Sequence, residues 1–267
     1  MAEKRGWAGG RSGPFAFCVL APNPGPMTLE GTNTWLLSGA AGGPAIVVDP
    51  GPDDPGHLER VLEAAHEHGM DPRLTMLTHG HPDHAAGARN FAELAGTPVR
   101  ALDPRFRLGD EGLVGGSTVA IGDVEVRVVS TPGHTSDSLS FLLVADGSLL
   151  TGDTVLGRGT TVVAYPDGRL DDYLESLQRL SELAAEGAIS RVLPGHGPVL
   201  DDPIGVVSAY RAHRQERLDQ VRAAVGAGAR TPHEVVEAVY ADVDRSVWPA
   251  AELSVRAQLE YLDVSLS

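Results

Sequence analysis

The amino-acid sequence predicts an α/β protein in which a mixed sheet system is flanked by helices and followed by a helical C-terminal part. Short, nearly continuous apolar runs alternate with amphipathic helical patterns over the first 200 residues, and such runs are typical of strands that are buried on both faces. Beyond residue 200 the strand signals stop and helical patterns remain. The 267 residues are 42% hydrophobic and 21% charged, a composition that supports a packed core.

The expected elements follow from the local patterns along the chain. Strands are predicted over residues 15–20, 32–37, 45–49, 74–78, 124–130, 139–144 and 148–151. Helices are predicted over residues 57–68, 84–94 and 171–185, and then over 203–226, 232–241 and 246–263. Thr231 and Pro232 mark one start clearly, because Thr is a good N-cap and Pro suits the first helical position.

These elements divide the chain into three parts. Residues 1–13 contain several Gly and Arg residues and are expected to form a flexible tail. Residues 14–202 are expected to form the α/β domain, and residues 203–267 a helical appendage.

The composition also bears on partners and compartment. The chain has 36 acidic and 21 basic residues, a formal net charge of -15, which repels phosphate backbones and favours a small-molecule substrate over RNA. Cys18 is the only cysteine, so neither an intramolecular disulfide nor a cysteine-rich zinc module can form. Without a secretory h-region or an apolar run of about 18 residues, we expect a cytoplasmic protein with no membrane partner. The sequence does not indicate the oligomeric state.

Residues that carry chemistry are concentrated in one run, Thr78-His79-Gly80-His81-Pro82-Asp83-His84. A predicted strand precedes the run, and residues i and i+2 of an extended segment point the same way, so His79 and His81 can converge on one ion. Pro82 keeps His81 extended and is suited to open a helix that carries Asp83 and His84 in its first turn. One short turn therefore projects four ligands in two directions, which suits two adjacent metal ions.

Three further candidate ligands follow predicted strands in Gly-containing turns. They are His134 in Thr131-Pro132-Gly133-His134, Asp153 in Gly152-Asp153, and His196 in Pro194-Gly195-His196-Gly197. Loops at the ends of rigid strands are usual supports for functional side chains. A single histidine is more often a packing or surface residue, and we interpret His57, His66, His68, His213 and His233 in that way.

The candidate ligands form a donor set of five imidazoles and two carboxylates. This set suits zinc, with manganese or iron as alternatives, so the expected cofactor is two Zn²⁺ per chain, or Mn²⁺ or Fe²⁺ in their place. Zinc lowers the pKa of bound water to about 7, which makes hydroxide available at neutral pH.

The order of the motifs resembles the signature of the metallo-β-lactamase superfamily: His-x-His-x-Asp-His, Thr-Pro-Gly-His-Thr, Gly-Asp-Thr and Pro-Gly-His-Gly. The resemblance implies an αββα sandwich with a winged-helix-like appendage. It also implies a first metal bound by His79, His81 and His134, a second bound by Asp83, His84 and His196, and Asp153 as the bridge. Asp49, in Val47-Val48-Asp49-Pro50-Gly51, resembles the aspartate that steadies the family's ligands from outside the metal site.

A narrower resemblance is to the lactamase-beta-like protein 2 group. It is carried by residues 23–35, 152–161 and 210–214 and covers about residues 15–262. That group includes a single-strand endoribonuclease and thioesterases that release polyketides from a carrier protein. Thr160 and Thr161 are then expected to border the site and to donate to a substrate oxyanion, or only to satisfy the loop backbone. Asp153 stands where the commonest zinc β-lactamases carry Cys, which argues against antibiotic hydrolysis.

The leading hypothesis is therefore a dinuclear zinc hydrolase that uses a metal-bridging hydroxide. Asp83 would be its catalytic residue, orienting the nucleophile or relaying its proton. The acidic surface, and the little room that the appendage leaves for a β-wing, favour an ester or thioester small molecule. The alternatives are a single-strand endoribonuclease and a mono-iron oxidoreductase of the same fold.

Overall fold

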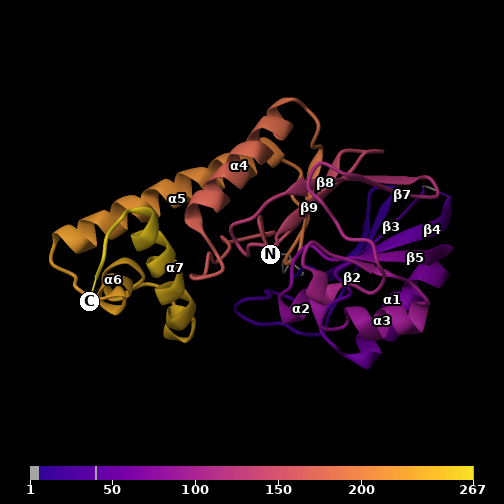
Figure 1. Ribbon diagram of the computed structural model, residues 1–267, viewed down its shortest axis with the longest axis horizontal. Helices are drawn as coiled ribbons and strands as arrows, with labels where there is room; N and C mark the ends of the chain where they lie inside the picture. Colours follow the sequence, from indigo (N-terminus) through magenta and orange to yellow (C-terminus); the bar gives the residue numbers. More distant parts are fainter. Residues whose placement is uncertain (1–5, 40, 267) are drawn as a thin grey trace, which may run out of the picture.

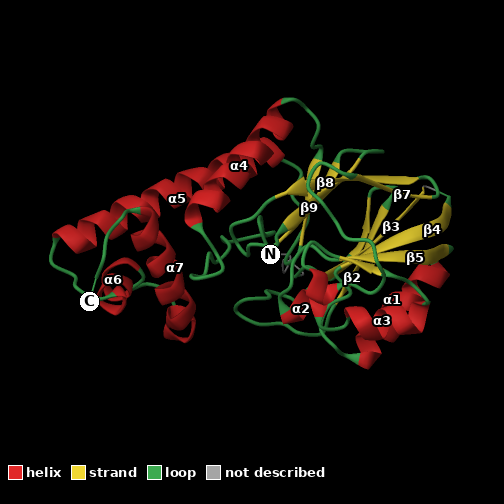
Figure 2. Ribbon diagram, in the orientation of Figure 1, coloured by secondary structure: helices red, strands yellow, loops and turns green. Residues whose placement is uncertain are grey.

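Two β-sheets packed face to face form the centre of the protein. The computed structural model describes residues 6–39 and 41–266 (Figure 1, Figure 2). The first sheet contains, in spatial order, β1 (Gly10–Ser12), β2 (Ala16–Leu20), β3 (Asn33–Gly39), β4 (Gly42–Val48), β5 (Met70–Met76) and β6 (Val99–Arg100). The second contains β11 (Arg191–Pro194), β10 (Ser148–Gly152), β9 (Leu139–Leu143), β8 (Val124–Ser130) and β7 (Thr118–Ile121). The pairs β4–β5, β5–β6 and β10–β11 are parallel and the other pairs antiparallel, so the prediction of mixed sheets is confirmed.

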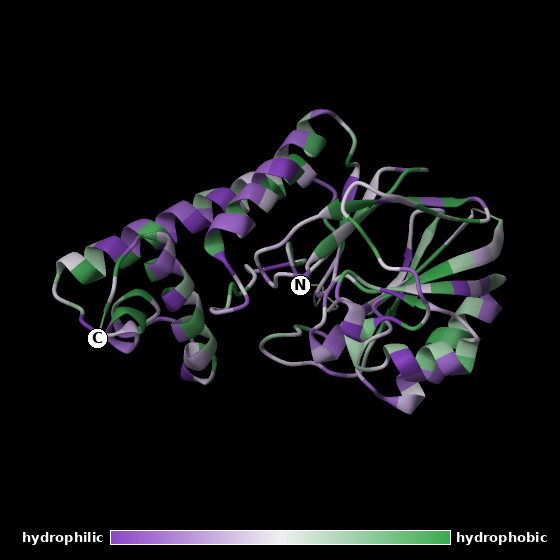
Figure 3. Cartoon of the chain, in the orientation of Figure 1, coloured by the Kyte–Doolittle hydropathy of each residue, from purple (hydrophilic) through white to green (hydrophobic). Residues whose placement is uncertain are grey.

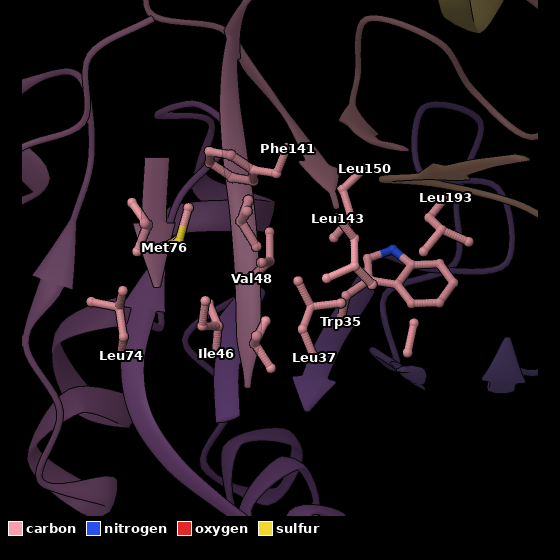
Figure 4. Packing of buried hydrophobic residues seen from close by; sticks show 14 of the residues in the cluster. Trp35, Leu37, Ile46, Val48, Leu74, Met76, Phe141, Leu143, Leu150 and Leu193 are labelled. Atoms are coloured by element: carbon pink, nitrogen blue, oxygen red, sulfur yellow. The ribbon is translucent and has the colours of Figure 1, made fainter. Parts of the chain in front are cut away.

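The main core lies between the sheets. Alternate residues of the central strands point into it, among them Trp35 and Leu37 of β3 and Ile46 of β4, where they meet Phe141 and Leu150 of the second sheet (Figure 4). The residues between them, such as those at positions 36, 45 and 47, are buried on the opposite face. Because both faces are covered, the strands read as continuous apolar runs. Each fully buried side chain of this kind contributes about 1.5–3 kcal/mol to stability.

Helices cover both outer faces of the sandwich. Helices α1 (Pro55–Glu67) and α3 (Ala88–Ala95) pack on the first sheet through Leu58, Val61 and Phe91. Helix α4 (Leu170–Ala185) packs on the second sheet through Tyr173 and Leu177 (Figure 2). This is the predicted αββα arrangement.

The helical appendage extends from α4. Helix α5 (Pro203–Gly226) lies along α4 and then meets α6 (Pro232–Val239) and α7 (Trp248–Tyr261), which follows the short 3-10 turn η2 (Arg245–Val247) (Figure 1). Hydrophilic residues are spread along α5, with hydrophobic ones at intervals (Figure 3). The appendage has a small core of its own, formed by Val221, Ala224, Val235, Val236, Ala251, Val255 and Leu259. Thr231 caps α6 as the Thr-Pro pair predicted, and it also forms a reciprocal capping box with Glu234.

The structure corrects the predicted tail. Residues 1–5 lie outside the described residues, but Gly10–Ser12 form β1 and pair with β2. The Trp7 indole donates a 2.7 Å hydrogen bond to Asn33 Oδ1 and lies 6.5 Å from the Trp35 ring, centroid to centroid. Backbone pairing and one partly buried indole therefore fix a segment whose Gly and Arg content suggested mobility.

The predicted helix over residues 84–94 is divided in two. Helix α2 (Pro82–Ala85) ends before Gly87, and α3 begins at Ala88. A Cβ at Gly87 would lie 2.8 Å from the Pro52 carbonyl oxygen and 2.9 Å from Leu58 Cδ2, so the backbone approaches its neighbours too closely for another residue. Among the described residues, no helix has the length and apolar character needed to cross a membrane.

His57, in the first turn of α1, makes stability depend on pH. Its side chain is buried and Nε2 lies 2.9 Å from Thr34 Oγ1. Burial, reinforced by Arg60, lowers the pKa of His57 to about 4. An unfolded histidine has a pKa of about 6.5, so the unfolded chain gains a proton between these values that the folded chain does not. The free energy of unfolding should therefore fall as the pH drops from about 6.5 towards 4.

The variant His57→Gln should make this fall shallower, by up to about 1.4 kcal/mol per pH unit. Urea unfolding at several pH values between 7 and 4.5 measures the slope. His66→Gln, at an exposed position of the same helix, controls for the loss of a histidine. An identical slope in wild type and His57→Gln would contradict the prediction.

Candidate metal centre

Loops from both sheets converge at one end of the sandwich. Asp49 follows β4, His79 follows β5, His134 follows β8, Asp153 follows β10 and His196 follows β11. Carboxylates and imidazoles from these five strand ends, with those of α2, form three groups. In each group the ligand atoms lie within 4.8 Å of one another. The groups are His79, His81, His134 and Asp153; Asp83, His84 and His196; and Asp49, His79 and His84.

The turn from His79 to His84 has the conformation that Pro82 predicts. His81 is extended, with φ -64° and ψ 143°, and it directly precedes helix α2. Asp83 and His84 lie in the first turn of that helix. His79 and His81 therefore face one group while Asp83 and His84 face the other.

Asp153 lies between the group of His79, His81 and His134 and the group of Asp83, His84 and His196. Its Oδ2 is 3.6 Å from His134 Nε2, whereas its Oδ1 is 3.4 Å from both His84 Nε2 and His196 Nε2. The side chain is almost fully buried, and Oδ1 has no hydrogen-bond partner among the described residues. One carboxylate thus faces both halves of the cluster.

The spacing of the ligand atoms fits metal binding. His134 Nε2 lies 3.0 Å from His81 Nδ1, and His84 Nε2 lies 3.2 Å from His196 Nε2. Zinc binds nitrogen at 2.0–2.1 Å with tetrahedral geometry, which places two such nitrogens about 3.3 Å apart. His79 Nε2 is also buried, and no residue that the structure describes forms a hydrogen bond with it. Buried polar atoms without partners are costly, so the donor set and its spacing fit divalent cations.

Hydrogen bonds behind the imidazoles fix their orientation. His84 donates from Nδ1 to Asp49 Oδ2 at 2.9 Å, and His79 donates from Nδ1 to Thr78 Oγ1 at 3.0 Å. Thr78 in turn donates to Asp49 through both its amide and its hydroxyl. These bonds leave the Nε2 lone pairs of both rings facing the cluster.

The other two buried imidazoles are oriented by backbone carbonyls. His134 donates from Nδ1 to Val162 O at 2.6 Å, and His196 donates from Nδ1 to Gly31 O at 3.2 Å. Both carbonyls belong to loops far away in the sequence. They are functional partners that the sequence did not reveal, because a backbone carbonyl has no residue signature.

The loop that carries His196 is held by the first sheet. Asn33 of β3 donates from Nδ2 to the carbonyls of Pro194 and Gly197, and Trp35 donates from Nε1 to Pro194. A Cβ at Gly195 would lie 2.7 Å from Asp153 Oδ1 and from His84 Cε1. Gly195 therefore lets the backbone pass directly behind the ligand atoms.

The ionisable groups perturb one another strongly. Burial alone would lower the pKa of His84, but Asp153 and Asp49 outweigh it and hold that pKa well above its usual value. Burial also opposes protonation of His196, yet Asp153 and Asp83 raise its pKa to about 9. Burial would raise the pKa of Asp153, but His196 and His84 hold it well below the usual value. The carboxylates therefore remain anionic and draw positive charge towards them.

The remaining groups follow the same balance. For Asp83, the hydrogen bond from His196 and the charge of His84 outweigh burial and lower the pKa to about 2. Burial, followed by the charge of His84, lowers the pKa of His79 well below its usual value, and burial also lowers that of His134. The first group is thus rich in neutral imidazole, the form that binds metals.

A cavity of about 150 Å³ opens onto His134 and Asp153. Pro26, Met27, Leu29, Leu156 and the segment 158–162 complete its lining. We call it the site cavity. Thr160 and Thr161 both line it, as predicted by position. The Thr161 hydroxyl lies 3.2 Å from His134 Nδ1, on the side of the ring that faces away from Asp153, so Thr160 is the better placed of the two to meet a substrate. Their oxyanion role stays a prediction.

Comparison with known proteins places the chain in a family. The model of the metallo-beta-lactamase superfamily matches residues 27–196, more than half of the chain. The chain belongs to the metallo-beta-lactamase superfamily. A second model, of the beta-lactamase associated winged helix domain, matches residues 231–263 of the appendage.

Relatives of this metallo-beta-lactamase family protein extend the match over most of its length. A beta-lactamase-like protein 2 homolog of Drosophila melanogaster is 31% identical and covers 92% of this chain and 86% of its own. An atrochrysone carboxyl ACP thioesterase of Aspergillus fumigatus is 32% identical, over 85% of this chain and 74% of its own. The crystal structure of a beta-lactamase domain protein from Burkholderia ambifaria superposes with a TM-score of 0.81 at 24% identity, covering 98% and 90% of the two chains. The αββα fold with its appendage is thereby confirmed.

Replacing the carboxylate behind His84 should weaken metal binding. In Asp49→Asn the amide cannot accept from His84 and Thr78 with the strength of a carboxylate, so the affinity for a divalent metal should fall about 10–100-fold. Competition with a chromogenic chelator measures the affinity. Asp53→Asn, which changes an exposed carboxylate bonded to Asn90, is the matched control. Equal affinity in Asp49→Asn and Asp53→Asn would contradict the assigned role.

Proposed function

We propose that the protein is a dinuclear zinc hydrolase of ester or thioester small molecules. One ion would be held by His79, His81 and His134, the other by Asp83, His84 and His196, with Asp153 shared between them. The position of Asp153 carries the proposal, because its two oxygens face different groups of imidazoles. When bound, the two ions supply Lewis acidity and a hydroxide nucleophile near neutral pH.

Asp83 is proposed as the catalytic residue. Its side chain is half-buried, unlike the buried Asp153, and Oδ2 accepts a 3.3 Å hydrogen bond from Thr32 Oγ1. The pKa of about 2 keeps it a carboxylate, which accepts hydrogen bonds and does not donate them. It can therefore accept a hydrogen bond from the attacking water and orient it, while Thr32 fixes the direction of the carboxylate.

The lining of the site cavity supports a small acyl substrate. Pro26, Met27, Leu29 and Leu156 offer apolar contacts next to His134 and Asp153. Members of the superfamily are commonly hydrolases, and the 32% identical fungal relative is named as an acyl carrier protein thioesterase. Asp153 in place of the cysteine of common zinc β-lactamases argues against antibiotic hydrolysis.

The test combines metal analysis with three parallel assays. Elemental analysis of the purified protein should give about two zinc ions per chain. An acyl thioester should be hydrolysed faster than a lactone or single-stranded RNA. Asp153→Ala should lower this activity at least about a thousandfold, because it removes the ligand that faces both ions. Asp201→Ala, at an exposed carboxylate, is the control.

Other outcomes would assign a different chemistry. One iron per chain without hydrolytic activity would favour an oxidoreductase. Cleavage of RNA alone, dependent on Asp153, would favour an endoribonuclease. Thioester hydrolysis that survives in Asp153→Ala would not be the chemistry of this centre.

A further inference from the structure

A second cavity lies between the sandwich and the appendage. It has a volume of about 250 Å³, and its lining includes Met27, Thr160, His213, Arg217, Tyr240 and Val247. We call it the interdomain cavity. Met27 and Thr160 line the site cavity as well, as do Pro26, Thr161 and Val162, so the two spaces share one wall. Together they reach the volume of about 300–1,000 Å³ typical of small-molecule sites.

Two arginines give the interdomain cavity positive charge without a counter-ion. Arg214 is buried, donates to the Thr161 carbonyl and lies over the Tyr173 ring. Arg217 lies over the Tyr240 ring, 4.7 Å from its centroid, and donates from Nη1 to the Val239 carbonyl. Within the described part of the chain neither arginine forms a salt bridge. A buried charge without a partner is costly, so an anion in this cavity would be stabilised.

Unused hydrogen-bonding atoms point to the same conclusion. Arg214 Nε and His213 Nδ1 are buried without a hydrogen-bond partner among the described residues. Arg217 directs Nε to His213 Nε2 and Nη1 to Val239 and Gln220, and no described residue accepts from its Nη2. The donors that remain are few, which suits a singly charged carboxylate better than a phosphate with its three acceptor oxygens.

The rest of the lining is apolar. Met27, Val243, Val247, Ala250 and Ala251 offer contacts to a hydrocarbon chain. A ligand that reaches from the site cavity into the interdomain cavity would therefore meet both apolar side chains and two arginines.

We propose that the interdomain cavity binds the distal carboxylate of an extended acyl substrate. The preferred substrates would then be monoesters or monothioesters of a dicarboxylic acid, in which one carboxyl group is esterified and the other is free. This inference rests on the proposed hydrolase function. Hydrolysis adds water across the C–S or C–O bond: the hydroxyl joins the acyl carbon, the thiol or alcohol leaves with the other proton of the water, and the new carboxylic acid releases its own proton to solvent to give a dicarboxylate.

The experiment compares two thioesters of N-acetylcysteamine that differ only at the distal end, hexanoyl and 5-carboxypentanoyl. The readout is the ratio of kcat/KM for the carboxylated over the neutral substrate. Wild type should prefer the carboxylated one about 10–100-fold, the strength of a charge-assisted hydrogen bond. Arg217→Gln should bring the ratio close to one, and Arg217→Lys should keep part of the preference.

Two further variants isolate the cavity from general effects of substitution. Val247→Asp adds a negative charge to the lining and leaves the hydrogen bonds of Arg217 in place, so it should also lower the ratio. Arg222→Gln changes an exposed arginine of the same helix that pairs with Asp219, and it should keep the wild-type ratio. Melting temperatures of all variants report whether each one folds.

A binding measurement makes this inference separable from the hydrolase proposal. Adipate, but not the uncharged adipamide, should raise the melting temperature of Asp153→Ala, and the added change Arg217→Gln should remove the shift. Hydrolysis that depends on Asp153 but shows no preference for the carboxylated thioester would overturn the inference and leave the hydrolase proposal standing. If the wild type hydrolyses neither thioester but adipate still binds in a way that depends on Arg217, only the hydrolase proposal would be overturned. Oligouridylate that displaces adipate and binds through Arg217 would assign the cavity to RNA instead.

Discussion

A cluster of candidate metal ligands at one end of the sandwich imposes the main constraint on this structure. Five imidazoles and two carboxylates gather there, most of them buried, with the ligand atoms of each group within 4.8 Å of one another and two pairs of imidazole nitrogens 3.0 and 3.2 Å apart. Such a cluster persists only with positive charge between its members, because buried anions and unpaired acceptors each cost several kcal/mol. The raised pKa values of His84 and His196 have the same cause, because protons on these imidazoles would supply positive charge next to the carboxylates. Divalent cations would supply more positive charge than protons and would bind the ligands with a fixed geometry.

The second constraint is the loop that joins this cluster to the appendage. The Val162 carbonyl accepts from His134, and one residue earlier the Thr161 carbonyl accepts from Arg214 of α5. Further along, the Tyr165 amide donates to the Leu253 carbonyl of α7. The appendage therefore holds the segment that orients a candidate ligand. A substrate group that contacts α5 or α7 can affect the same loop, which links recognition at the appendage to the geometry of the site.

Local sequence rules predicted the part of the site that depends on local geometry. Pro82 dictates an extended His81 and a helix start at the next residues, and the structure has both. Strand ends were predictable because buried strands leave apolar runs. The position of Gly87 against Pro52, by contrast, depends on how α1 packs, and it divides a helix that periodicity alone made continuous. The pairing of β1 likewise depends on a partner edge that composition does not describe.

The interdomain cavity was beyond sequence reasoning for a similar reason. His213 was predicted to pack on an amphipathic helix although residues 210–214 carry the narrower resemblance, and nothing local distinguishes Arg217 from other residues of α5. Their character comes from docking, since α5, η2 and α7 enclose them together with Met27 of a distant loop. Arg222, which is exposed on the same helix, forms a salt bridge with Asp219. The tertiary arrangement leaves Arg214 and Arg217 without such a counter-ion among the described residues.

The distribution of charge explains how such a cavity can select its ligand. The whole chain carries a net charge of -15, so a polyanion that extends over the surface meets repulsion along its length. Salt screens exposed charges beyond about 8 Å at physiological ionic strength, while charges that face each other inside a cavity are screened much less. A small molecule with one carboxylate therefore interacts mainly with Arg214 and Arg217 once it has entered, and the acidic exterior matters little to it. The same acidic surface that disfavours RNA leaves the binding of a single buried anion almost unaffected.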